Sequence, residues 1–99
     1  MTIEYIGKAD SMLAEYTAML QRSDARNAEA KALLAEAEEL AAEVRHLEST
    51  EFMMTPDEVM QSNAHRALLE REIDAKSGRV LQLHQETFHE WESWTARQY

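Results

Sequence analysis

The chain has no cysteine, one proline and two glycines among its 99 residues. Without cysteine it cannot form a disulfide, a thiolate metal site or a cysteine nucleophile. Glycine and proline are the usual residues of tight turns, so their scarcity argues against a β-sheet fold. The sequence has no apolar run long enough to cross a membrane. Its N-terminal residues also lack the charged start and apolar run of a signal peptide. We therefore expect a soluble, cytoplasmic protein.

Aromatic residues are also few, at 7% of the chain. The hydrophobic fraction is 44%, but much of it is alanine, which buries little area. The most abundant residues are alanine, leucine, glutamate, arginine and glutamine, which favour helices. Such a composition is typical of long helices and coiled coils. It predicts an all-α fold with a modest core, to which a second copy or a partner would add buried surface.

Acidic residues dominate the charge. The chain has 19 acidic and 10 basic residues, for a formal net charge of −9. Such a surface repels nucleic-acid phosphates and anionic membranes. We therefore expect no direct nucleic-acid or membrane partner, and a protein partner with a basic surface. The simpler interpretation is that the acidity only keeps the protein soluble.

The clearest local signal is a helix start at Thr55. Its hydroxyl can cap the helix, and Pro56 suits the first helical position. Glu58 lies three residues after Thr55, as in a capping box. Met54 and Val59 occupy the two positions of a hydrophobic staple. These signals together predict that a helix begins here.

The first half of the chain has apolar residues at alternating intervals of three and four, the heptad pattern of a coiled coil. Two positions in this series, Ser23 and Arg26, are polar. Either one helix spans residues 3–48, or two helices meet at residues 22–27; the absence of proline and glycine there favours the continuous helix. The apolar positions are Tyr5, Ala9, Met12, Tyr16, Met19, Ala30, Leu33, Ala37, Leu40, Val44 and Leu47.

The second half predicts a helix over residues 56–96. Its apolar residues recur with a period near 3.6, so the stripe drifts around the helix. Ser77 and Gly78 interrupt the stripe, which indicates a kink or a close helix contact. The residues of the predicted apolar stripe are Val59, Met60, Ala64, Ala67, Leu68, Ile73, Val80, Leu81, His84, Phe88 and Trp91.

The connection at residues 49–55 is short, so the two helices should pack as an antiparallel hairpin. With the turn centred near residue 52, facing residues should have numbers that sum to about 105. This register gathers the aromatic side chains at the end that holds both termini. The aromatic residues concerned are Tyr5, Tyr16, Phe88, Trp91, Trp94 and Tyr99.

Two Glu-x-x-His pairs, Glu43 with His46 and Glu86 with His89, have the spacing of metal ligands in di-iron helical bundles. At 100° per residue, however, both pairs point away from the apolar faces of their helices, whereas di-metal ligands must point inward. His84 lies on the apolar stripe, where a hydrogen-bonded core or interface histidine is expected. No nucleophile or phosphate-loop motif is present. We therefore expect no metal, no cofactor and no catalysis.

The best candidates for partner contact are Phe88, Trp91 and Trp94, because aromatic side chains dominate binding hot spots. An acidic face that contains Glu36, Glu39 and Glu43 would steer a basic partner. The sequence thus favours a non-catalytic interaction module that forms a homodimer, such as an adaptor, chaperone or assembly factor. The alternative is a small acidic inhibitor, as phages encode, that blocks the nucleic-acid-binding surface of a basic protein.

Overall fold

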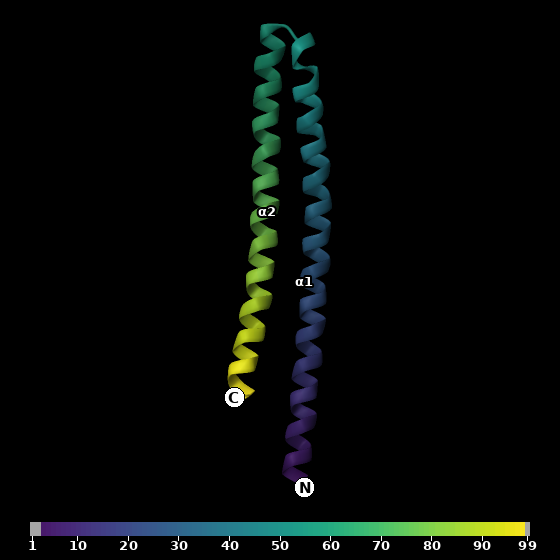
Figure 1. The fold of residues 1–99 in the computed structure, drawn as a ribbon, viewed down its shortest axis with the longest axis vertical. Helices are drawn as coiled ribbons and strands as arrows, with labels where there is room; N and C mark the ends of the chain where they lie inside the picture. Colours follow the sequence, from purple (N-terminus) through teal and green to yellow (C-terminus); the bar gives the residue numbers. More distant parts are fainter. Residues whose placement is uncertain (1–2, 99) are drawn as a thin grey trace.

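A computed structural model describes residues 3–98, and describes side chains from Gly7 to Gln98. Helix α1 (Ile3–Thr50) leads through a short 3-10 turn, η1 (Glu51–Met53), into helix α2 (Pro56–Gln98). The two helices pack side by side and antiparallel in a hairpin of 80 × 17 × 13 Å (Figure 1). The all-α hairpin expected from the sequence is confirmed. Tyr99 lies outside the described residues, and so does the side chain of Tyr5.

Thr55 caps the start of α2 as predicted, although the Glu58 carboxylate contacts its hydroxyl rather than its backbone N–H. The Glu58 backbone N–H donates to the Thr55 hydroxyl oxygen at 3.3 Å, and this hydroxyl donates to the Glu58 carboxylate at 3.0 Å. Met54 and Val59, the predicted staple residues, are both half-buried. Local capping therefore sets the residue at which the chain turns back.

Helix α1 is continuous through Ser23 and Arg26. Both residues are partly buried against α2, so the heptad series runs on through them. The continuous helix, rather than the split at residues 22–27, is the arrangement found. We call the facing positions of the two helices the seam. In α1 the covered seam residues are Met12, Met19, Ser23, Arg26, Ala30, Leu33, Ala37, Leu40, Val44 and Leu47.

The apolar stripe predicted for α2 is not the face that packs against α1, and most of its residues are exposed. Leu81, Phe88 and His84 are exposed, whereas Leu69 and Leu83, which the stripe omitted, are buried. The true seam of α2 keeps the heptad spacing of α1 and includes polar residues, which hid it from a search for apolar residues alone. Its members are Val59, Ser62, Arg66, Leu69, Ile73, Lys76, Val80, Leu83, Thr87, Glu90 and Trp94.

The register differs from the expected one. Facing residues such as Arg79 with Glu29 and Lys76 with Glu36 have numbers that sum to about 110 rather than 105. The reason lies in the turn: the 3-10 turn follows directly on α1, and the chain becomes extended at Met54 before α2 begins. With α2 starting later, α1 extends past the end of α2, and the N end lies beyond the C end in Figure 1.

The core between the helices is thin. Among the described residues, the buried hydrophobic side chains are Met19, Ala30, Val44, Leu69, Val80 and Leu83. The register places a charged residue opposite an apolar one in several layers, such as Arg26 opposite Leu83 and Lys76 opposite Leu33. Long aliphatic stems of such residues cover apolar surface while their charged ends reach solvent. The hairpin is thus joined by a mixed seam rather than by a continuous apolar one.

The sequence suggested a kink or a close helix contact at Gly78. The structure shows no close contact there. Gly78 lies in the uninterrupted helix α2 and is exposed. A Cβ atom built on Gly78 has no heavy atom within 4 Å apart from its immediate neighbours. Packing therefore does not require glycine at this position.

Candidate functional site

One flank of the hairpin is lined with ion pairs between the helices. Its α1 residues recur every seven positions and reach side chains of α2 from one end of the hairpin to the other. Arg79 pairs with Glu29 at 2.9 Å, and Lys76 pairs with Glu36 at 2.8 Å. The residues in this α1 series are Glu15, Arg22, Glu29, Glu36 and Glu43. We call this side the ion-paired flank.

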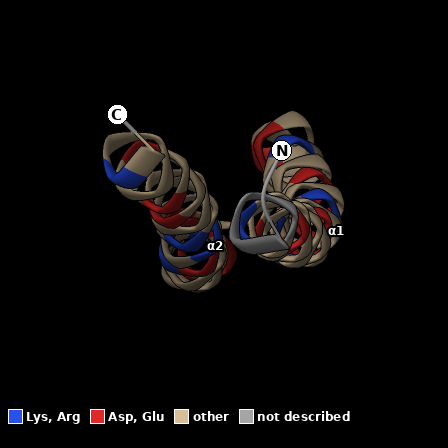
Figure 2. Ribbon diagram, turned by 90° about the horizontal axis from the view of Figure 1, so that it is seen from below, with Lys and Arg blue, Asp and Glu red and all other residues tan. Residues whose placement is uncertain are grey.

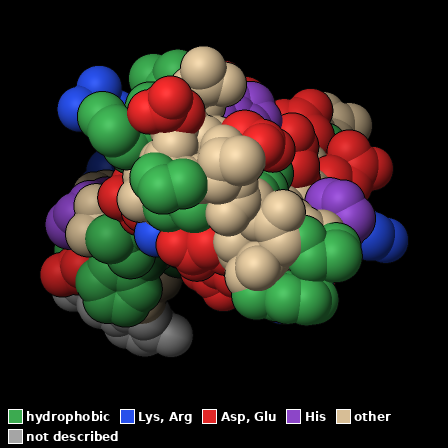
Figure 3. All heavy atoms as spheres, turned by 90° about the horizontal axis from the view of Figure 1, so that it is seen from above, with side chains coloured by type: hydrophobic (Ala, Val, Ile, Leu, Met, Phe, Trp, Pro, Cys, Tyr) green, Lys and Arg blue, Asp and Glu red, His purple; other side chains and the backbone are tan. Residues whose placement is uncertain are grey.

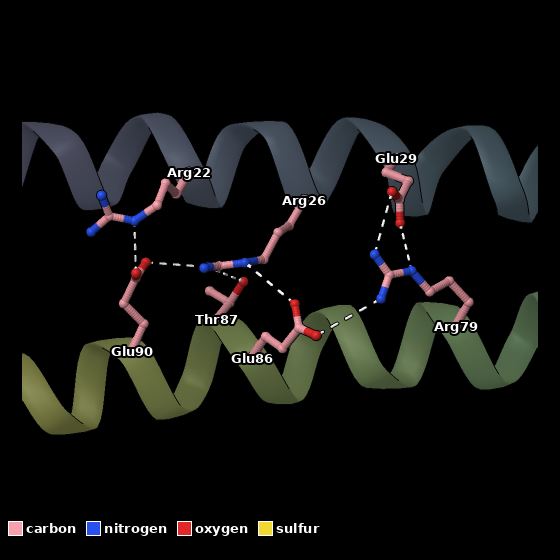
Figure 4. Close-up of polar contacts among 7 residues, drawn as sticks. All are labelled: Arg22, Arg26, Glu29, Arg79, Glu86, Thr87 and Glu90. Atoms are coloured by element: carbon pink, nitrogen blue, oxygen red, sulfur yellow. Dashed lines mark hydrogen bonds and ion pairs between the residues drawn. The ribbon is translucent and has the colours of Figure 1, made fainter.

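Arg26 is the centre of the densest polar contacts on this flank (Figure 4). Its Nη1 atom donates to Glu90 Oε1 at 3.2 Å and to the Thr87 hydroxyl oxygen at 3.3 Å. Its Nε atom lies 3.8 Å from a Glu86 oxygen. Glu86 therefore borders the seam. The sequence had predicted that it points away from the inner face of its helix. Arg22 completes the group by donating to the other oxygen of Glu90 at 2.7 Å.

Polar contacts on the ion-paired flank shift the pKa values of Glu90 and Lys76. Partial burial by itself raises the pKa of Glu90, but hydrogen bonds from Arg26 and Arg22 outweigh it and hold that pKa below its ordinary value of 4.5. The hydrogen bond to Glu36 raises the pKa of Lys76 above its ordinary value of 10.5. Both shifts favour the charged forms of Glu90 and Lys76, and the contacts of these two residues join α1 to α2.

The opposite flank presents large apolar side chains to solvent. It is formed by three columns with seven-residue spacing, which begin at Leu13 in α1 and at Met60 and Asn63 in α2. Leu13 is 64% exposed, Leu81 59% and Phe88 65%. We call this side the apolar flank, after its members Leu13, Leu20, Leu34, Met60, Leu81, Phe88 and Trp91.

Charge is distributed very unequally between the two flanks, although both signs occur on both helices (Figure 2). The three columns of the apolar flank contain three carboxylates, Glu48, Glu70 and Asp74, and no lysine or arginine. Within the described residues, their one ion pair joins Glu48 to Arg66 at 3.6 Å, near the turn. The apolar flank is thus unlike the rest of this acidic surface.

The aromatic residues gather at the end that holds the termini, in part as expected. The Tyr16 ring lies edge-on to Trp91, with centroids 5.5 Å apart, and 5.9 Å from Trp94. The Trp94 Nε1–H group donates to a Glu15 carboxylate oxygen at 3.1 Å. Phe88 points outward instead, with its ring 6.0 Å from that of its neighbour His89.

The predicted partner-binding residues do not form one surface. Phe88 and Trp91 lie on the apolar flank, whereas Trp94 lies in the seam against Tyr16. Glu36 and Glu43 lie on the ion-paired flank, where they contact Lys76 and His65. Glu39 is exposed at a heptad position that faces away from α2. The three glutamates of the predicted acidic face recur at intervals of three and four, so they lie on one side of α1, but two of them are engaged by α2.

The turn forms a second apolar patch. Phe52 is 82% exposed and Met53 is 69% exposed. Figure 3, which views this end of the hairpin, shows hydrophobic side chains beside acidic ones and histidine. Of the three adjacent residues 52–54, Met54 alone is half-buried, so Phe52 and Met53 do not plug this end of the hairpin.

Little in the described residues points to chemistry. No group of three or more histidine, aspartate or glutamate side chains converges within residues 7–98, whose side chains the structure describes. The Glu43 carboxylate contacts His65 at 3.0 Å, and that of Glu86 contacts Arg26 and Arg79. His84 lies exposed on the apolar flank rather than in a core. Neither described helix has a stretch that is apolar and long enough for a membrane span.

No protein-family model, characterised protein or solved structure shows a significant match to this chain.

Proposed function

We propose that the chain is a non-catalytic protein–protein interaction module whose docking surface is the apolar flank. The observation that carries this proposal is the series of exposed apolar side chains beside the seam, with Leu13, Leu81 and Phe88 each more than half exposed. A two-stranded coiled coil needs apolar residues at its seam alone. A third apolar column on each helix is typical of helices that pack in a larger bundle.

The ion-paired flank complements this role. Contacts such as Arg79 with Glu29 and Lys76 with Glu36 engage both helices at one flank. They help to keep the helices in register while the opposite flank stays uncovered. A partner can therefore dock on the apolar flank without displacing the ion pairs of the opposite flank.

The same ion pairs weigh against the alternative of an acidic inhibitor. A mimic of nucleic acid must present free carboxylates along one face. Glu29, Glu36 and Glu43 instead contact basic or histidine side chains of their own chain. Within the described residues, Glu39 is the one glutamate of the predicted acidic face that has no such contact, so a basic surface finds few free carboxylates there.

The proposal is tested with one pair of matched double variants. Leu81→Glu with Phe88→Glu places two carboxylates on the apolar flank. Ala28→Glu with Ala35→Glu places two on the exposed outer side of α1. We expect chemical cross-linking in extracts of the source cells to capture a protein with the wild type and the control, and to lose it with the flank variant. Equal capture by all three forms contradicts the proposal, provided circular dichroism shows equal helicity.

A further inference from the structure

We propose that the occupant of the apolar flank is a second copy of this chain, so that two hairpins form a four-helix bundle. This inference rests on the proposed function and names its partner. Four-helix bundles bury the apolar faces of hairpins that are otherwise half covered. Three observations favour a second copy: the surface area of the chain, the composition of the flank and the thinness of the seam.

The elongated single chain exposes more area than a compact protein of the same mass. It amounts to 7517 Å², whereas a compact protein of this mass exposes about 5,800 Å². The excess, about 1,700 Å², lies within the roughly 1,000–2,500 Å² that each copy buries in obligate homodimers. Pairing two hairpins along their length would remove about the area by which the chain exceeds a compact fold.

The composition of the flank favours a copy of itself over a charged partner. It contains no lysine or arginine, and of the chain's 19 acidic residues it contains Glu48, Glu70 and Asp74. A basic, acidic or nucleic-acid partner therefore gains little from charge there. What the flank offers is apolar side chains at seven-residue intervals, and the matching surface is another flank with the same interval. An isologous dimer needs this kind of self-complementarity.

The seam between the two helices has few large buried side chains. Its buried cluster consists of Ala30, Val80 and Leu83, with Leu33 packed against it. A seam with so few large buried side chains leaves an isolated hairpin of this length marginally stable. A second layer of helices would cover Leu34 and Leu81, which flank this cluster and are 52% and 59% exposed.

Asp74 provides an internal test of the assignment. It belongs to the same seven-residue column as Leu81 and Phe88, and it is the one charged member of that column. In a dimer formed through this column, each copy brings one such carboxylate into the interface, where burial without a partner is unfavourable. Asp74→Leu should therefore tighten the dimer, which is the opposite of the effect of Leu81→Glu.

The experiment is sedimentation equilibrium of the full chain from low to high micromolar concentration. We expect the wild type to reach the mass of a dimer. The flank variant, Leu81→Glu with Phe88→Glu, should raise the dissociation constant by at least about tenfold. Asp74→Leu should lower it, and the control, Ala28→Glu with Ala35→Glu, should leave it within about twofold. Added salt should strengthen the dimer because it screens repulsion between two acidic chains.

A monomer mass at high micromolar concentration, with helicity intact, overturns the assignment of a second copy. If the flank variant then still loses the partner captured by cross-linking, the proposed function stands and the occupant is another protein. A dimer that survives the flank variant unchanged overturns the assignment as well, because its interface must lie elsewhere. Weaker association in salt would also contradict it and would indicate a contact based on opposite charges.

Discussion

Arg26 Nη1 and Glu90 Oε1 lie 3.2 Å apart in the seam between α1 and α2, with 18% and 22% of their side chains exposed. A charge pair in so covered a position gains less stability than its attraction suggests, because both groups lose water. Its value is often specificity: a polar residue at a seam position fixes the register of a coiled coil. Thr87 and Glu86 also contact Arg26. These contacts favour the observed register of α1 and α2 at this layer.

Replacing Arg26 should separate these two effects. Arg26→Ala leaves Glu90 with Arg22 alone and should lower the free energy of unfolding by about 1 kcal/mol. Arg26→Met, which fills a similar volume without charge, should be neutral or stabilising. Arg45→Ala is the control: it removes an exposed pair with Glu38 and should change stability by less than about 0.5 kcal/mol. Urea titration measures all three, and equal losses for Arg26→Ala and Arg45→Ala would contradict the role of the covered pair.

The lowered pKa of Glu90 predicts a pH dependence of stability. The unfolded chain releases this proton near the ordinary value of 4.5, and the folded chain releases it at lower pH. The contribution of Glu90 is therefore fully present above that value and is lost as the pH falls through the folded pKa. Glu90→Gln should reduce the change in urea midpoint between about pH 6 and pH 3. Glu39→Gln, on the outward side of α1, serves as control; an equal reduction there would count against this explanation.

The sequence predicted those parts of the hairpin that a single local pattern determines. The capping signals at Thr55 identify the start of α2, and the heptad series identifies the inner face of α1. Ser23 and Arg26 looked like breaks in that series because a polar residue at a seam position is indistinguishable, in one helix, from the start of a loop. The partners of Arg26, which are Thr87 and Glu90, lie more than 60 residues away, and no local rule includes them.

The inner face of α2 could not be predicted from apolar residues alone, because the helix carries two apolar series. One contains Leu69 and Leu83 and packs on α1; the other contains Leu81 and Phe88 and stays exposed. The predicted stripe mixed members of both series, such as Val80 and Leu81, because apolar character alone does not separate them. Charge distinguishes the two series. The α1 column with Glu29 and Glu36 is charged at every seventh position. Its partners Arg79 and Lys76 lie at or beside the series of α2 that packs on α1.

The two aromatic residues Trp94 and Phe88 should respond differently to truncation. Trp94 packs on Tyr16 and bonds to Glu15, so Trp94→Ala should lower the free energy of unfolding by about 2 kcal/mol. Phe88 is 65% exposed, so Phe88→Ala should change the unfolding of the dilute monomer by less than about 0.5 kcal/mol and should weaken association instead. Urea titration at low concentration distinguishes them. Equal destabilisation by the two variants would place Phe88 in the hairpin core.

Gly78→Ala should stabilise the protein by about 0.5–1 kcal/mol, because alanine favours a helix interior over glycine. The position is exposed, and an added Cβ meets no heavy atom within 4 Å there. The melting temperature at low concentration, followed by circular dichroism, measures the effect. The exposed Ser77→Ala variant is a suitable comparison, since it should gain less. A loss of stability in Gly78→Ala would indicate that glycine is needed for a bend in α2.

Because the chain has no cysteine, a single introduced thiol can report directly whether a second copy covers the apolar flank. A single thiol is placed at Leu81→Cys on the apolar flank or at Ala35→Cys on the outer side of α1, and its rate of reaction with a thiol reagent is followed as protein concentration rises. We predict that the rate at position 81 falls several-fold as dimer forms, while the rate at position 35 stays constant. Equal and concentration-independent rates at both positions would contradict the account.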